Sequence, residues 1–178
     1  MSKVRLYGST SGYVELAAPA VADDGTLTLP TAASGFGKIL QVVRATDTVQ
    51  RTTTSTSYVD ANLSVTITPS SDTSRLIIVY TGYGQMNAGT QPDQRYSVII
   101  TDSTDTALSG AEGTQIGVSF GSVVTSVADA INIWGYVEPG STSALTYKVR
   151  FKSAHASNTA VLVNANTTGQ LYAFEVAA

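Results

Sequence analysis

Hydrophobic and polar positions alternate along much of this chain with the period of two that is typical of β-strands. In residues 63–68, Leu63, Val65 and Ile67 share one face, and the Ser and Thr side chains between them share the other. Residues 75–80 carry a continuous apolar run instead, which predicts a strand that is buried on both faces. The chain shows no segment with the period of an amphipathic helix.

Turn signals separate these segments from others of the same kind. Residues 69–74 are a cluster of Pro, Ser, Asp and Thr, and Pro139 followed by Gly140 is a second signal. The strands predicted in this part of the chain are residues 39–44, 63–68, 75–80, 96–100, 116–120, 131–137, 145–151, 160–163 and 171–176. Short strands with turns between them favour an all-β fold, so we expect residues 38–178 to form an antiparallel β-sandwich or jelly-roll head domain.

Residues 1–37 are small, turn-rich and short of large side chains. Alternation in residues 4–6, 13–16 and 26–30 predicts two or three short strands, and residues 34–37 form the expected hinge to the head. Because this segment has little apolar surface to bury alone, we expect it to be an anchor that is ordered against sister copies or an underlying surface. The candidate contact residues are Leu6, Tyr7, Tyr13, Val14, Leu16, Leu27 and Leu29.

Composition narrows the classes of function. The chain has 178 residues, a formal net charge of −3 and 13% charged residues, against about 25% in a typical soluble domain. Lys and Arg form no cluster, so we expect no nucleic-acid partner. The chain contains no Cys, no apolar leader after Met1 and no apolar run of about 18 residues. We therefore expect no disulfide and no membrane insertion.

Candidate catalytic groups are few. His155 is the only histidine, and the polar residues 152–158 around it predict a plain loop. Paired carboxylates could cleave a glycan, and Asp102 with Asp105 could contribute to a Ca²⁺ site. The carboxylates of this chain that could do so stand beside turn residues, where Asp usually caps its own backbone. They are Asp23, Asp24, Asp102, Asp105 and Glu112. We expect no enzyme, no catalytic residue, no metal and no cofactor.

The aromatic residues allow two interpretations, a sandwich core or a binding face. They are Tyr80, Tyr83, Trp134, Tyr136 and Tyr147. The mid-strand position of Trp134 favours the core, whereas Tyr83 stands between two glycines and both interpretations stay open. Residues 82–94 are the longest polar connection predicted in the head, either a binding loop or a contact with a neighbouring subunit. The candidate receptor-facing residues in it are Tyr83, Gln85, Asn87 and Gln91.

Two stretches of the chain carry a resemblance to known proteins. The first is GSTSGYVELAAPAV at residues 8–21, followed by TLTLP at 26–30. It resembles a segment of phage virion surface proteins of the tail-fibre, head-fibre and capsid-decoration type. The second resembles the opening of a β-sandwich module in phage tail fibres, and it comprises KILQVVR at 38–44, RTTTSTSYVD at 51–60 and LSVTITPSSDTSRLIIV at 63–79. The resemblance implies a structural or adhesive virion protein that is made in the host cytoplasm, and it carries no catalytic residues.

The resemblance, together with the small N-terminal segment, favours a homotrimer. Two virion roles compete. The chain begins with its own Met and shows no long shaft, which favours a capsid decoration (cement) protein that binds the major capsid protein and projects its head outward. The alternative is a tail-fibre tip that binds a host-surface glycan. A third hypothesis, a free carbohydrate-binding module, rests on the tyrosines of the predicted β-head.

Overall fold

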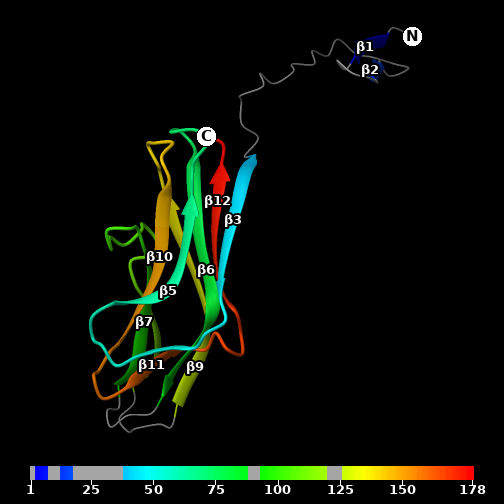
Figure 1. The fold of residues 1–178 in the computed structure, drawn as a ribbon. Coiled ribbons are helices and arrows are strands. Elements are labelled where there is room, and N and C mark those ends of the chain that lie inside the picture. The colour runs from blue at the N-terminus through cyan, green and yellow to red at the C-terminus, as the bar shows by residue number, and fades with distance from the viewer. Residues whose placement is uncertain (1–2, 8–12, 18–37, 88–92, 120–125) are drawn as a thin grey trace. The chain divides into compact units, whose positions relative to one another are not determined.

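The computed structural model describes residues 3–7, 13–17, 38–87, 93–119 and 126–178 (Figure 1). The chain divides into two compact units, Met1–Ser34 and Gly35–Ala178. In the first unit, β1 (Lys3–Tyr7) pairs antiparallel with β2 (Tyr13–Ala17), which confirms the strands predicted there. The register sets Val4 opposite Leu16, Leu6 opposite Val14, and Tyr7 opposite Tyr13. The predicted strand at 26–30, with Leu27 and Leu29, and the predicted hinge at 34–37 lie outside the described residues.

The second unit is built from strands alone in its described part, and every described pairing is antiparallel, so the predicted all-β sandwich is confirmed. Its strands are β3 (Ile39–Asp47), β4 (Arg51–Thr53), β5 (Val59–Ile67), β6 (Arg75–Asn87), β7 (Asp93–Thr101), β8 (Thr114–Ser119), β9 (Ser126–Val137), β10 (Leu145–Ser153), β11 (Thr159–Leu162) and β12 (Gly169–Val176). Each strand predicted from residue 39 onward overlaps one of these. The short β4 is not among the predicted strands.

The strands form two sheets, drawn as two layers in Figure 1. One sheet has the order β5-β10-β7-β8. The other is organised by the long β6, which pairs with β9 along one side. On its other side β6 pairs first with β12 and then with β11, and β3 and β4 pair in turn with those two strands. β3 and β9 therefore border the described sheet at the end where β6 begins.

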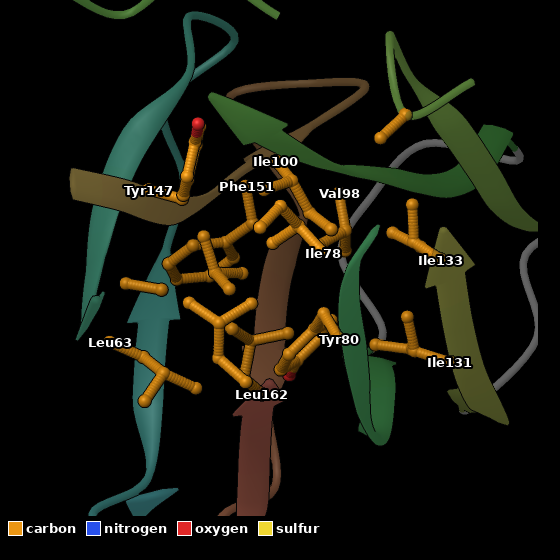
Figure 2. Close-up of a cluster of buried hydrophobic side chains, with 14 of the residues drawn as sticks. Leu63, Ile78, Tyr80, Val98, Ile100, Ile131, Ile133, Tyr147, Phe151 and Leu162 are labelled. Atoms are coloured by element: carbon orange, nitrogen blue, oxygen red, sulfur yellow. The ribbon is translucent and has the colours of Figure 1, made fainter. Parts of the chain in front are cut away.

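The core lies between the two sheets, because alternate residues of each strand point inward (Figure 2). Tyr80, Tyr96 and Phe151 are its largest fully buried side chains. Figure 2 labels Tyr80 and Phe151 together with Leu63, Ile78, Val98, Ile100, Ile131, Ile133, Tyr147 and Leu162 of the same core. The interpretation of residues 75–80 as buried on both faces holds for Val79 but not for Ile77, which is half-buried on the outer face.

The predicted polar connection at 82–94 is wrong over most of its length, because β6 continues to Asn87 and β7 begins at Asp93. Gly82 and Gly84 do not make this segment a flexible loop. They face the interior of the sandwich, where Tyr80 packs over Gly82 and Tyr96 packs over Gly84. In sequence, two glycines around Tyr83 favour a loop, whereas in the structure they make room for two aromatic rings inside a strand.

Candidate interaction surface

The outer face of the six-stranded sheet carries large apolar side chains near the start of β6. The register sets one row across four strands, formed by Val42, Phe174, Ile77 and Tyr136. The next outward-facing row is formed by Arg44, Tyr172, Val79 and Trp134. We name as the apolar face the set of Ile39, Val42, Ile77, Val79, Trp134, Tyr136, Tyr172, Phe174 and Val176.

Several side chains of the apolar face are exposed to a degree that is unusual for their size. The exposed fraction is 56% for Trp134, 55% for Ile39, 50% for Val42 and 46% for Tyr136. A shallow groove of about 210 Å³ lies on the apolar face, and its lining is entirely apolar. The residues that line it are Ile39, Ile77, Trp134, Phe174 and Val176.

The expectation that Trp134 belongs to the core is wrong. Ile131 and Ile133 are buried, and Gly135 lies against Leu108. Because neighbours on a strand point to opposite faces, Trp134 must point outward. Tyr136 follows the same rule, whereas Tyr80 and Tyr147 lie in the core. The sequence itself indicates this orientation. Ile131 and Ile133 are typical core residues, and the period of two places Trp134 on the opposite face of the strand.

Charged groups stand at the border of the apolar face and are satisfied within the chain. Arg44 donates to Gln170 Oε1 from Nε at 3.1 Å and from Nη2 at 2.8 Å, and its guanidinium lies 5.7 Å from the centre of the Tyr172 ring. Arg75 pairs with Glu138 at 3.4 Å. The Tyr136 hydroxyl also donates to Glu138, at 3.2 Å. A partner that binds this face therefore does not need charged groups to pair with Arg44 or Arg75.

Three of the four candidate receptor residues lie further along β6, on the strand and not on a loop. Tyr83, Gln85 and Asn87 share the outward face of β6 and stand opposite Ala130, Ala128 and Ser126 of β9. Gln85 Nε2 donates to Asn87 Oδ1 at 2.5 Å, and Tyr83 is exposed. The fourth candidate, Gln91, lies outside the described residues, and whether this row binds a receptor stays a prediction.

The Asp102–Asp105 turn is structural, as predicted. Asp102 Oδ1 accepts hydrogen bonds from the backbone N–H of Thr104 at 2.8 Å and of Thr106 at 3.0 Å. Burial alone would raise the pKa of Asp102, but these bonds and the Thr104 hydroxyl hold it below its usual value. Asp105 is engaged elsewhere, with Lys148 Nζ at 2.6 Å and Arg150 Nη1 at 3.2 Å.

A cleft of about 280 Å³ lies beside this turn and is lined in part by Asp102, Leu108, Pro139 and Tyr147. Tyr147 is almost fully buried. Its burial, and to a lesser degree the charge of Asp102, raise the pKa of its hydroxyl to about 12. A phenol with that pKa stays protonated at neutral pH, so the group is suited to donate a hydrogen bond and not to act as a base.

The other predicted chemical groups lie in connections or outside the described residues. His155 lies in the turn between β10 and β11, which confirms the predicted loop, and Glu112 is exposed in another connection. Asp23 and Asp24 fall outside the described residues. Within the described ranges, no group of three or more His, Cys, Asp or Glu side chains is arranged to hold a metal ion.

Comparison with known proteins identifies no family for this chain. No protein-family model matches it, and no match to a curated protein was found. The described residues include no helix long and apolar enough to cross a membrane.

Proposed function

We propose that this chain is a non-enzymatic phage virion structural protein, a trimeric capsid decoration protein that stabilises the head shell and projects its β-sandwich outward. The observation that carries the proposal is the division of the chain into a small N-terminal unit and a complete sandwich. The resemblance of residues 8–21, 26–30 and 38–79 to virion modules supports the same role.

The N-terminal ribbon has the properties expected of an anchor, because it needs contact with another surface to be stable. β1 and β2 are each five residues long and pair with one another. A two-stranded ribbon by itself is at best marginally stable in water, because it has no second layer against which to bury a face. Docking on a capsid surface would supply that layer. The major capsid protein is therefore the proposed partner of this unit.

The proposed mechanism is clamping of neighbouring capsid subunits. Burial of a few hundred Å² of apolar area per copy would contribute several kcal/mol, at about 25 cal/mol per Å², before the cost of ordering the segment. Repetition over a shell multiplies this modest contact. The sandwich folds around its own core, so it remains available to project from the surface.

Deletion of residues 1–34 tests the anchoring role. We expect the remaining chain to fold, because residues 35–178 form a compact unit with its own core, and to lose its binding to capsids. The measurement is cosedimentation with capsids stripped of the protein, alongside a thermal unfolding curve.

Val14→Pro is the matched variant for this deletion. It keeps the chain length but removes one backbone N–H from the strand opposite Leu6, so it should weaken the ribbon. We expect a loss of capsid binding similar to that of the deletion. Normal decoration by both variants would contradict the anchoring role.

The alternative role, a fibre tip that binds a host-surface glycan, is favoured by the outward row of Tyr83, Gln85 and Asn87 on β6. An aromatic ring next to amide groups is a common way to bind a sugar. Tyr83→Ala should then abolish glycan-array binding by the full chain, with Tyr136→Ala on the neighbouring strand as the control. If the wild-type protein binds no glycan, this alternative and the carbohydrate-binding module both fail.

A further inference from the structure

We propose that the apolar face is the surface through which copies of this chain associate with one another. The face is formed by one end of the six-stranded sheet, where β3, β12, β6 and β9 lie side by side. The inference rests on the proposed function only for the number of copies, since self-association is measured on the purified protein without a virion.

The area of the apolar face is in the range of contact surfaces on soluble proteins. A Trp or Tyr side chain has an area of about 150–250 Å², so Trp134 and Tyr136, each about half exposed, leave roughly 200 Å² of ring surface in water. Ile39, Val42 and their neighbours extend the patch to several hundred Å². The largest apolar patch of a typical monomer is about 300–600 Å² and is often functional, so a patch of this size is a candidate contact surface.

The chemistry of the face favours a protein surface over a glycan or a charged ligand. The groove between Ile39 and Trp134 has no polar lining. A sugar needs hydrogen-bonding groups beside the aromatic ring, and these are missing from the groove. The neighbouring cations Arg44 and Arg75 already bind Gln170 and Glu138. The face therefore matches an uncharged, apolar surface.

A second copy of this chain offers such a surface. The charged fraction of the chain is only 13%, and the apolar face is itself uncharged, so two copies can meet without desolvating an unpaired ion. Lys38, which leads into the N-terminal unit, immediately precedes Ile39 of the apolar face. Copies that meet through this face would thus bring the starts of their N-terminal connections near the same interface.

The size of the face sets the strength of the association. A stable interface buries about 800 Å² on each partner, more than the several hundred Å² of apolar surface available here. The polar border around Arg44 and Gln170, and the edge that β3 forms in the described sheet, must contribute the rest. We therefore expect association that depends on concentration and is sensitive to single substitutions at the centre of the face.

Trp134 reports directly on this interface because it is the only tryptophan of the chain. Sedimentation velocity of the full chain, from about 1 µM to about 100 µM, should show growth in mass from one copy to a defined oligomer. Over the same range, tryptophan emission should shift to shorter wavelength and acrylamide quenching should fall, because a second copy covers Trp134, a residue that is 56% exposed in the single chain.

Two substitutions place a charge in the proposed interface. Trp134→Arg and Val42→Glu should each raise the dissociation constant at least about 30-fold, as loss of a central contact residue does. Val42→Glu keeps the fluorescence reporter. Thr66→Arg is the control, because Thr66 is exposed on β5 of the other sheet, and it should leave association unchanged. Thermal unfolding of each variant verifies that the sandwich remains folded.

Three results would overturn the inference. The first is a monomer at the highest concentration with a freely quenched Trp134. The second is a monomer in which Trp134 is shielded at every concentration, since part of the same chain then covers the face. The third is an oligomer that survives both Trp134→Arg and Val42→Glu. A protein that self-associates as expected but ignores capsids would contradict the virion role and leave this interface intact.

Discussion

Gly82→Ala is expected to lower the free energy of unfolding by about 2–3 kcal/mol, because the added methyl group overpacks the core where the neighbouring side chain has no space to move. A Cβ at residue 82 would lie 2.5 Å from Tyr80 Oη and 3.0 Å from Tyr80 Cζ. Tyr80 is fully buried in the sandwich core, so its ring has no free space to move into. At an unobstructed strand position, replacing Gly by Ala usually does not lower stability. A loss of stability on Gly82→Ala would therefore indicate a steric clash.

A second substitution isolates the cause. The Tyr80 hydroxyl is buried and has no hydrogen-bond partner among the described residues, so Tyr80→Phe alone should be close to neutral. In the Tyr80→Phe background the atom nearest to the new Cβ is gone, and Gly82→Ala should cost about 1 kcal/mol or less. Urea unfolding of the four proteins of this double-mutant cycle gives the coupling between the two residues.

Gly84 supplies the matched comparison. A Cβ there would lie 2.7 Å from both Cε2 and Cζ of Tyr96, which are ring carbons that Tyr96→Phe retains. Gly84→Ala should therefore remain strongly destabilising in the Tyr96→Phe background, unlike the Gly82 pair. Equal rescue at the two sites, or no cost of Gly82→Ala in the wild type, would contradict the packing explanation.

The fold was predictable from the sequence where one face of a strand is buried and the other face is exposed to solvent. Leu63, Val65 and Ile67 alternate with small polar residues, and the structure buries them in β5 as expected. The order of the strands was not predictable, because it depends on pairings between residues far apart in the chain. Leu145, for example, stands opposite Ile67, and Gly169 stands opposite Asp47.

The candidate surface was predictable only in part, because local signals compete with tertiary packing. The glycines at 82 and 84 carry a strong turn signal, and only the positions of the Tyr80 and Tyr96 rings show that these glycines belong to a strand interior. The mid-strand position of Trp134 favours the core, although alternation with the buried Ile131 and Ile133 places its side chain outside. A position within a strand is thus a weaker guide to burial than the period-two alternation along the strand.

The carboxylate of Glu175 is expected to be the strongest pH-dependent contributor to the stability of the head. It is fully buried on β12, and Oε1 accepts hydrogen bonds from the Ser70 N–H at 2.7 Å, the Ser70 hydroxyl at 2.7 Å and the Ser74 hydroxyl at 2.6 Å. Oε2 accepts from Gln41 Nε2 at 2.6 Å. The group thus ties β12 to β3 and to the turn before β6.

These bonds decide the protonation state of Glu175. Burial alone would raise the pKa of the carboxyl, but the donors on Ser74, Gln41 and Ser70 outweigh it and lower the pKa from 4.5 to about 2. A folded-state pKa below the unfolded one adds stability that is fully present above pH 4.5 and is lost as the pH falls to about 2. The shift corresponds to about 3 kcal/mol.

Glu175→Gln should therefore lower the free energy of unfolding by about 3 kcal/mol at pH 7, because it removes the charge and turns an amide N–H₂ toward groups that donate. The difference between variant and wild type should shrink as the pH falls from about 4.5 to about 2, when the wild-type carboxyl gains its proton. Urea unfolding at several pH values between about 2 and 7 measures both effects.

The contribution of Glu175 can be separated from those of other acids. The pKa values of Asp47, Asp102 and Asp105 are also lowered, so the wild-type profile alone mixes several groups, whereas its difference from Glu175→Gln does not. Glu138→Gln is the control, since Glu138 is exposed and pairs with Arg75 at the surface, and it should change stability by less than about 1 kcal/mol. A Glu175→Gln difference that stayed constant over the whole pH range would mean that the side chain stabilises the sandwich by packing and not through its charge.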